Sequence, residues 1–375
     1  LKSRACLFEG TFRKYHGLQG WESYLEVCAD ASKRFIDESG YAIYDSGTTP
    51  YLGLFSSLKA INTEIVLARA YNTDIGLKHD VNGYLTSITM GRPGLLKNIA
   101  NMYLMKDGTP FTSQPGWETM QLPEESKNRD GRFAQTVRTP GYKRIDDTAL
   151  SAPNLAATMT GYQLVKYLQS AKYDSYNAST NDLPLLRAAE VMLNYAEAKA
   201  ELGEFSETVW NATIKLLRER AGVDGAMPSA YDPYMAEYFL NTTTDMAILE
   251  IRRERGIELL LENCRWDDDM RWGMGRLLER PWYGVYVGEL GKVYDMDGDG
   301  SGDVCFVREN PPVTEPGVTY RVLGGDYALT DGDSGYIECY IRMTRKWDDK
   351  KYVRPIPTTA LNDNPALGQN YGWEK

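Results

Sequence analysis

Histidine is nearly absent from this sequence of 375 residues, which contains only His16 and His79. Neither lies in a recognisable motif, and a histidine at the end of a predicted helix, as His16 is, is typical of a capping residue. Serine–histidine–aspartate hydrolases and histidine-rich metal enzymes are therefore not indicated. A glycine-rich phosphate loop is also missing, because GRPG (91–94) and GEFS (203–206) lack the flanking strands that such loops need.

Cysteines and long apolar runs are equally sparse. The five cysteines have no CxxC spacing and predict neither a disulfide framework nor a zinc site; they are Cys6, Cys28, Cys264, Cys305 and Cys339. No stretch approaches the ~18 apolar residues of a membrane span, so membrane contact is expected only through a lipid anchor or a partner. The net charge of −10 and the lack of a basic patch exclude nucleic acid as a partner.

Apolar spacing predicts two helical hairpins. The first covers residues 1–40. The second begins at Asp182 as an N-cap, runs to Gly203 and continues with a helix over 207–221. Each hairpin has about the length of a tetratricopeptide unit, ~34 residues. We therefore expect a helical scaffold over 182–280.

A long amphipathic helix is predicted within 248–273, and its pattern loosens at the three aspartates 267–269. Its apolar residues recur at i, i+3, i+4 and i+7, namely Ile257, Leu260, Leu261 and Cys264. The alternating charges of 250–258 are spaced for i, i+3 and i, i+4 pairs, which are usually solvated. We expect a solvent-exposed charged face here, with Trp266 and Trp272 anchored in the core.

Between the hairpins, residues 41–181 are rich in glycine, proline, asparagine and aspartate and largely lack helical periodicity. Their aromatic and apolar content argues against disorder. We expect a ligand face built from this insertion and from 282–350, within a loop and β-hairpin region over 281–375. The candidate ligand contacts are aromatic residues among glycine and proline, namely Tyr84, Trp117, Tyr142, Trp282 and Tyr283.

An aspartate-rich loop, YDMDGDGSGDVCF (294–306), has the oxygen spacing that suits a hard cation. The candidate ligands, at positions 1, 3, 5, 7 and 9 of calcium-loop numbering, are Asp295, Asp297, Asp299, Ser301 and Asp303. Position 12 is Phe306 and not the glutamate of an EF-hand, and the flanking residues are extended in pattern. The loop therefore predicts either a structural Ca²⁺ at a hairpin tip or an acidic turn without an ion.

Several segments, in order, carry a family resemblance. They are ACLFEGTFRKYHG (5–17), GYAIYDSG (40–47), NMYLMKDGTPF (101–111), NRDGRFAQTVRTPGY (128–142), LPLLRAAEVMLNYAEAKAELG (183–203), RERAGV (218–223), ILEIRRERGIELLLENCRWDDDMRWG (248–273) and PIPTTALNDNPALGQNYGW (355–373). Together they resemble the SusD/RagB family, surface lipoproteins that capture glycans or peptides for import across the outer membrane of Gram-negative bacteria. One departure is Gly131, where the family more often has proline.

The resemblance implies a mainly α fold, with tetratricopeptide-like helical hairpins, long loop-rich insertions and small β-hairpin elements, in one SusD-like domain over 1–375. It also implies an outer-membrane, cell-surface lipoprotein that binds a glycan and works with a SusC-like TonB-dependent transporter. Family members are longer, so an N-terminal segment with the anchor is expected ahead of this chain.

A binding protein is thus expected, and not an enzyme. Three alternatives stay open. A RagB-like protein would bind peptides, a helical-repeat adaptor would bind a protein segment, and a glycoside hydrolase would use two of the 52 aspartates and glutamates.

Overall fold

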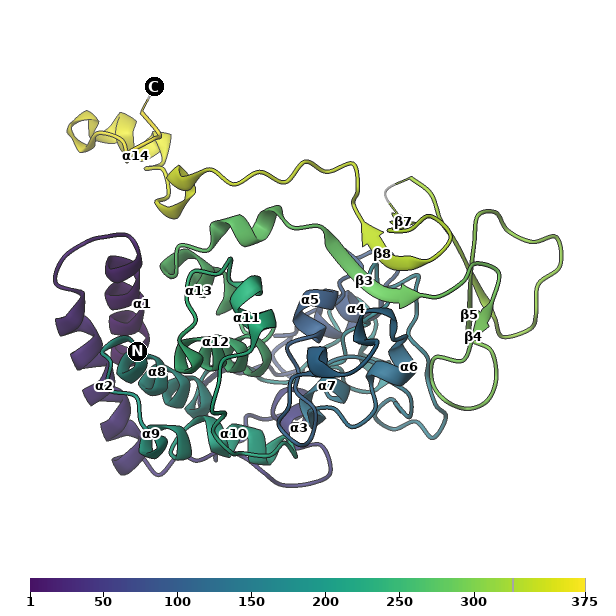
Figure 1. Cartoon of the computed structure of the whole chain (residues 1–375), viewed down its shortest axis with the longest axis horizontal. Helices are drawn as coiled ribbons and strands as arrows, with labels where there is room; N and C mark the ends of the chain where they lie inside the picture. Colours follow the sequence, from purple (N-terminus) through teal and green to yellow (C-terminus); the bar gives the residue numbers. More distant parts are fainter. Residues whose placement is uncertain (326, 375) are drawn as a thin grey trace.

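In the computed structural model, which describes residues 1–325 and 327–374, the chain forms a helical layer, a turn-rich middle segment, a two-stranded ribbon and two small three-stranded sheets. The helical layer lies at one side of the molecule and the small sheets lie at the other (Figure 1). This arrangement confirms the predicted mainly α fold with small β elements. Within the described residues, every helix is too short or too polar to cross a membrane.

The N-terminal helical hairpin forms as the sequence predicts. Helix α1 (Lys2–Tyr15) is followed by α2 (Trp21–Glu38), and the turn between them contains Gly17 and Gly20 with φ of 71° and 73°. Glycine adopts this left-handed conformation readily because it has no Cβ. The turn therefore explains why both glycines lie where the helical spacing is interrupted.

The hairpin packs on α8 (Ala188–Glu201) through small residues. A Cβ on Gly10 would lie 2.7 Å from Leu25 Cδ2, so only glycine allows α1 this close to α2. On α8, Ala189 and Ala196 are fully buried in the same core cluster. Close helix packing therefore depends on the small side chains that the sequence shows at these positions.

The rest of the helical layer consists of shorter helices. They are α9 (Glu207–Asn211), α10 (Ile214–Arg220), α11 (Pro233–Tyr238), α12 (Met246–Glu258) and α13 (Arg265–Arg271). The single helix predicted over 207–221 is wrong, because the backbone breaks at Thr213. The Thr213 hydroxyl donates a 2.6 Å hydrogen bond to the carbonyl of Val209, a local bond that competes with helix continuation.

The long helix predicted within 248–273 is interrupted earlier than the expected loosening at 267–269, so it appears as α12 and α13. Leu261 and Asn263, which lie between these helices, have φ of 62° and 60°. That left-handed conformation cannot continue an α-helix. Trp272 is buried as predicted, but Trp266 is 45% exposed, so the expectation that it anchors the core was wrong.

The start of the second predicted hairpin is a strand and not a helix. Strand β2 (Leu183–Arg187) pairs antiparallel with β1 (Ile65–Arg69), and α8 begins only after it. Asp182 was predicted as an N-cap, but its carboxylate accepts hydrogen bonds from the backbone N–H groups of Ala60 and Tyr71. The strand partner lies far earlier in the chain, so local sequence could not predict this pairing.

Residues 41–181 are rich in turns, as predicted. Their helices are α3 (Pro50–Ser56), α4 (Val81–Thr86), α5 (Lys97–Ala100), α6 (Leu122–Glu125) and α7 (Gly131–Ala134). Short 3-10 turns occur here and later in the chain, at Phe111–Ser113, Trp117–Thr119, Ala171–Tyr173, Gly275–Glu279, Asp349–Tyr352 and Pro365–Leu367. Phe133, Tyr162 and Leu168 are almost fully buried, so the segment supplies core as well as surface.

Two three-stranded sheets follow the helical layer. One has the order β3 (Trp282–Val287), β8 (Gly335–Cys339), β7 (Tyr327–Leu329), with antiparallel neighbours. The other consists of β4 (Val293–Tyr294), β5 (Val304–Val307) and β6 (Thr319–Val322), where β4 and β5 form the predicted hairpin and β5 and β6 are parallel. A Cβ on Gly284 would lie 2.1 Å from the Thr160 oxygen, so β3 lies directly against the middle segment.

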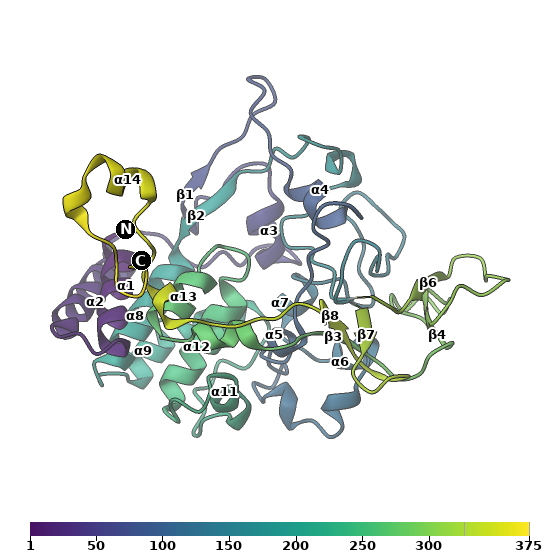
Figure 2. The ribbon, with the colours of Figure 1, turned by 90° about the horizontal axis from the view of Figure 1, so that it is seen from above.

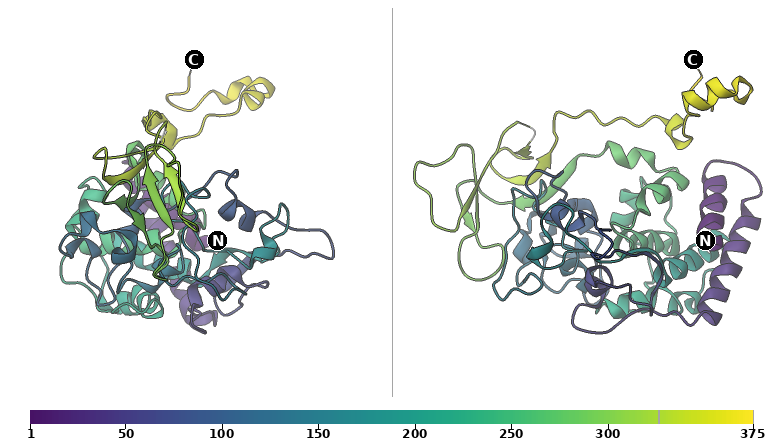
Figure 3. Two further views of the ribbon diagram at one scale, coloured as in Figure 1. Left: turned by 90° about the vertical axis from the view of Figure 1, so that its right-hand side faces the viewer. Right: turned by 180° about the vertical axis from the view of Figure 1, so that it is seen from behind.

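The C-terminal segment runs back from the sheets over the helical layer and carries α14 (Thr358–Asp363) away from the body (Figures 1 and 3). Both chain ends lie on the helical side (Figure 2). The ring of Tyr352 packs edge-on against His16 at 4.7 Å. His16 is the C-cap of α1, as predicted, and its Nε2 lies 2.9 Å from the Met270 carbonyl oxygen.

The alternating charges of α12 are buried, so the prediction of a solvated face was wrong. Glu258 is 0% exposed. Its carboxylate accepts hydrogen bonds from Arg132, Arg187 and Arg220 at 2.8, 2.6 and 2.5 Å. These arginines come from α7, β2 and α10, which spacing along one helix cannot reveal. Buried charges are stable only when they are fully paired, so this network joins the helical layer to the middle segment.

Candidate ligand-binding site

Three tyrosines share one face of the sheet formed by β3, β8 and β7. Tyr283 and Tyr286 belong to β3, and Tyr336 belongs to β8. The rings of Tyr283 and Tyr336 stack with centroids 5.8 Å apart and planes 24° apart, and Tyr286 meets Tyr336 edge-on at 5.6 Å. All three side chains are partly exposed. We call these three side chains the tyrosine face.

Polar groups border the tyrosine face. Glu338 pairs with Tyr283 across the strands, and the Tyr336 hydroxyl donates to the backbone carbonyl of Glu118. Burial raises the pKa of Tyr283, and the charges of Glu338 and Asp331 raise it further. Burial, followed by the nearby Glu118 carboxylate, raises the pKa of Tyr336. Both hydroxyls therefore stay protonated near neutral pH; that of Tyr336 donates to Glu118, and that of Tyr283 can donate to a ligand.

A buried ion pair supports the tyrosine face. The Lys97 ammonium lies 5.8 Å from the ring centroid of Tyr336 and forms a buried salt bridge with Glu125. Tyr162 donates its hydroxyl proton to the same carboxylate at 2.5 Å. Side chains held in this way keep one geometry, which favours binding because little freedom is lost when a ligand arrives.

Two predicted contacts, Trp117 and Tyr283, lie in this region. Trp117 begins the short turn that contains Glu118, and its ring packs edge-on against Phe111 at 6.3 Å and Tyr234 at 6.0 Å. Because Tyr336 is hydrogen-bonded to Glu118, the Trp117 turn borders the tyrosine face. Trp117 is partly buried, so part of its indole serves packing.

Trp282 points to the opposite side of β3, because neighbouring residues on a strand face opposite ways. Its ring packs edge-on against Tyr340 at 5.5 Å, and the Arg345 guanidinium lies 5.2 Å from its centroid. Tyr142 lies elsewhere, beneath the Arg138 guanidinium at 5.2 Å. Burial raises the pKa of Tyr142. The structure therefore does not bring Trp282 and Tyr142 to the tyrosine face.

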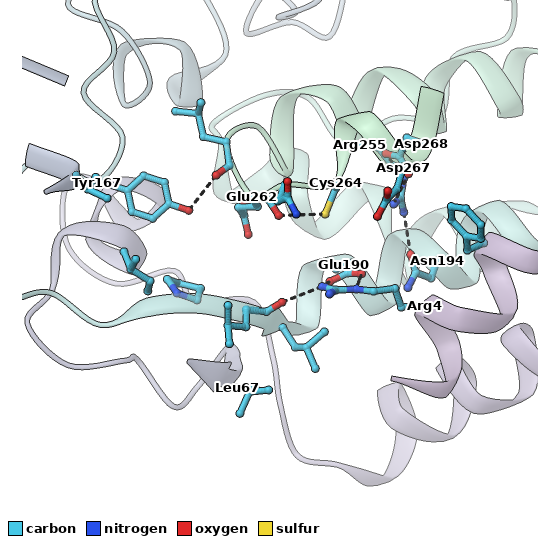
Figure 4. Close-up of a pocket in the computed structure, with 18 of the residues that line it drawn as sticks. Arg4, Leu67, Tyr167, Glu190, Asn194, Arg255, Glu262, Cys264, Asp267 and Asp268 are labelled. Carbon is cyan, nitrogen blue, oxygen red and sulfur yellow. Dashed lines mark hydrogen bonds and ion pairs between the residues drawn. The ribbon is translucent and has the colours of Figure 1, made fainter. Parts of the chain in front are cut away.

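Tyr84, the remaining predicted contact, is 48% exposed on α4 and lines a separate groove of about 790 Å³. The groove walls include Leu67, Leu185 and Leu261. Its charged side chains are largely paired with one another. Arg4 binds the Glu190 carboxylate at 2.6 Å, and Arg255 binds that of Asp268 at 3.0 Å (Figure 4). The groove therefore offers mainly apolar surface.

Tyr286, Tyr336 and Glu338 were not predicted. The alternation in GYIEC (335–339) is a strand signal that places Tyr336 and Glu338 on one face. The sequence does not show that this strand pairs with β3, which is needed to bring Tyr336 to Tyr283. Pairing of distant strands, and not composition, assembles the tyrosine face.

The aspartate-rich loop lies at the tip between β4 and β5. Carboxylate oxygens of Asp295, Asp297 and Asp303 lie within 4.8 Å of one another, close enough to share one cation. Burial raises the pKa of Asp303, and the charges of Asp297 and Asp295 add to that rise. The three carboxylates thus concentrate negative charge at this tip.

The other two predicted ligands are placed differently. Asp299 accepts a 2.6 Å hydrogen bond from the backbone N–H of Ser301 and is not part of the three-carboxylate group. Gly300 turns the loop with φ of 90°, which agrees with the predicted sharp turn. Ca²⁺ takes 6–8 oxygen ligands, so the three aspartates would need backbone carbonyls or water to complete its coordination.

Solved structures share this fold. A SusD-like protein from Bacteroides fragilis matches with a TM-score of 0.64 and 18% identity, over 99% of this chain and 64% of that protein. A SusD-like carbohydrate-binding protein from the same species matches with a TM-score of 0.62 and 21% identity, over 97% of this chain and 63% of that protein. This chain therefore spans less than two thirds of the length of either relative.

Sequence comparison gives the same assignment. Among curated proteins, no sequence matches this chain. The model of the SusD family matches residues 69–373, which is most of the chain. This match includes the tyrosine face, the aspartate-rich loop and the buried charges of α12. The chain belongs to the SusD family.

Proposed function

We propose that this chain captures glycans at the cell surface and delivers them to a SusC-like TonB-dependent transporter in the outer membrane. The tyrosine face carries the proposal, because Tyr283 and Tyr336 present stacked, partly exposed rings on a sheet. Sugar rings pack their C–H faces on aromatic rings, and their hydroxyls take directed hydrogen bonds. Glu338 and Asp331 lie beside these rings and offer carboxylate acceptors for such hydroxyls.

The family supports this proposal. One relative, 21% identical, is described as a SusD-like carbohydrate-binding protein. We further propose that the protein is held at the outer membrane by a lipid anchor, as its resemblance to surface lipoproteins implies. In this mechanism the protein binds and transfers its ligand without breaking bonds, so no catalytic residues are assigned.

The first prediction is that one soluble polysaccharide binds saturably and is not cleaved. Calorimetric titration of a panel of polysaccharides and peptides, with reducing ends assayed in the same samples, measures both properties. Glycan binding without new reducing ends supports capture. New reducing ends would contradict it and indicate a glycoside hydrolase, and binding of peptides alone would indicate a RagB-like cargo.

We also propose that the aspartate-rich loop holds a structural Ca²⁺. Asp295, Asp297 and Asp303 come from the two ends of one loop between paired strands, and their carboxylate oxygens lie within 4.8 Å of one another. A cation among them would offset their mutual repulsion and fix the loop. Hard oxygen donors of this kind suit Ca²⁺.

Calcium is therefore expected to stabilise the protein against thermal unfolding. At a free concentration of 100 times Kd, a single site contributes about 2.7 kcal/mol to the free energy of unfolding. Scanning calorimetry with Ca²⁺, with Mg²⁺ and with a chelator measures this effect. Asp297→Asn should remove the Ca²⁺ response, whereas Asp333→Asn, an exposed aspartate outside the loop, should keep it. An unchanged melting temperature in millimolar Ca²⁺ would contradict the proposal.

A further inference from the structure

Three residues form a row across one end of the sheet made by β3, β8 and β7. In the strand register Trp282 pairs with Cys339, and Cys339 pairs with Tyr327. An arginine covers each end of this row. The Arg345 guanidinium lies 5.2 Å from the ring centroid of Trp282, and the Arg321 guanidinium lies 4.3 Å from that of Tyr327.

A third arginine, Arg92, lies near the middle of the row. It donates hydrogen bonds to the backbone carbonyls of Ala156 and Leu155 at 2.7 and 3.2 Å. Burial raises the pKa of the Cys339 thiol, and the charges of Arg321, Arg92 and Arg345 all act against that rise. All three guanidinium groups therefore lie within electrostatic range of the Cys339 thiol. We call these three arginines the arginine row.

The arginine row lacks a carboxylate partner within the part of the chain that the structure describes. None of its nitrogens lies within 4.0 Å of a carboxylate oxygen there, and the Nε atoms of Arg321 and Arg345 are buried without a hydrogen-bond acceptor. Each side chain is also partly exposed. Within the described residues, three neighbouring positive charges are thus left without a paired carboxylate in a chain of net charge −10, and an anion from solvent can reach them.

Backbone strain occurs at the same place. Arg92 and Tyr340 have φ of 51° and 56°, a left-handed conformation that bulky residues rarely adopt. Such strain persists where surrounding contacts impose it, and it is concentrated at binding sites. The Tyr340 carbonyl accepts a 3.4 Å hydrogen bond from Arg345, and its ring packs against Trp282 at 5.5 Å.

We propose that the arginine row binds an anionic sugar residue of the captured glycan, which carries a carboxylate or a sulfate. Arg92, Arg321 and Arg345 would bind the anionic group, and the sugar ring would pack beside Trp282 and Tyr340. Guanidinium groups match the planar geometry of carboxylates and form strong charge-assisted bonds to anionic oxygens. The inference rests on the proposed function and names the class of glycan that the protein captures.

The test compares polymers that differ only in charge. Polygalacturonate is titrated beside the same polymer with its carboxyl groups reduced to alcohols, and dextran sulfate is titrated beside dextran. At least one anionic polymer should bind at least tenfold more tightly than its neutral match, and added salt should reduce the difference. The pair that shows the difference identifies the anion as carboxylate or sulfate. This measurement uses the unmodified protein, so it does not depend on whether a variant folds.

Substitutions test whether the arginine row causes the preference for the anionic polymer. The double change Arg321→Met and Arg345→Met should remove the preference for the anionic polymer. Arg34→Met should keep it, because Arg34 is exposed on α2. Equal affinity for both members of each pair, or a preference that survives the double change, would overturn the anionic-sugar inference but leave glycan capture standing. Failure of every polymer, neutral or anionic, to bind would overturn both.

Discussion

Replacing Glu258 with glutamine is expected to lower the free energy of unfolding by about 3–5 kcal/mol. The carboxylate is fully buried and accepts hydrogen bonds from Arg132, Arg187 and Arg220. Glutamine has nearly the volume of glutamate but no negative charge, so these three buried arginines lose the carboxylate that balances their positive charge. Chemical denaturation at pH 7 measures the loss. Because the Glu258 side chain is buried and cannot contact a ligand, we expect glycan binding by the folded variant to change little.

The matched control is Glu38→Gln on α2. Glu38 is exposed and lies 3.6 Å from Arg34 at the i, i+4 spacing. Exposed pairs of this type contribute about 0.3–0.5 kcal/mol. A loss as small for Glu258→Gln as for Glu38→Gln would show that the Glu258 carboxylate does not stabilise the fold as described.

The same network predicts a pH dependence. Burial acts to raise the pKa of Glu258, but Arg220, Arg187 and Arg132 outweigh it and hold the pKa well below its ordinary value. The depressed pKa means that the stabilisation is present above the unfolded value of about 4.3 and is lost as the pH falls toward the folded pKa. In the Glu258→Gln variant, the free energy of unfolding should therefore fall less steeply at acidic pH than in the unmodified protein, as chemical denaturation across a pH series would show.

Truncating Tyr336 to alanine is expected to weaken glycan binding about 100-fold, or about 2.7 kcal/mol. Its ring contacts both Tyr283 and Tyr286, and its hydroxyl fixes the turn that contains Glu118. Alanine therefore removes the central stacking surface and releases its neighbours. Calorimetric titration with the best polysaccharide of the panel measures the change.

Two further variants sharpen this prediction. Tyr336→Phe keeps the ring and loses only the hydrogen bond to Glu118, so it should weaken binding less than alanine does. Tyr371→Ala changes a tyrosine that is 85% exposed near the C-terminus and should leave binding unchanged. Wild-type affinity in Tyr336→Ala would place the glycan site somewhere other than the tyrosine face.

Local signals predicted much of the helical layer. The hairpin of α1 and α2 follows from apolar spacing and from a turn that contains Gly17 and Gly20. Interactions between distant segments were not predictable in this way. Asp182 resembles an N-cap, but the chain there pairs with β1. The charges of α12 resemble a solvated face, but their partners lie on other elements, so only the tertiary structure shows that they are buried.

The candidate sites also differ in whether local sequence is enough to predict them. The aspartate-rich loop was predictable because its candidate ligands come from one short segment. Of the five predicted aromatic contacts, Tyr283 lies on the tyrosine face, whereas Trp117 borders it. Tyr336 joins Tyr283 only through the pairing of β3 with β8, and the arginine row forms on the opposite side of the sheet only through the pairing of β8 with β3 and β7. Aromatic residues in loops indicate binding in general, but strand pairing decides which of them form one surface.

The most direct test of glycan capture is a crystal structure of this chain with the oligosaccharide that binds best in the panel. We expect intact sugar rings stacked on Tyr283 and Tyr336, with hydroxyls within hydrogen-bond distance of Glu338. A ligand found instead in the groove lined by Leu67 and Tyr84, or a glycan cleaved in the crystal, would contradict it.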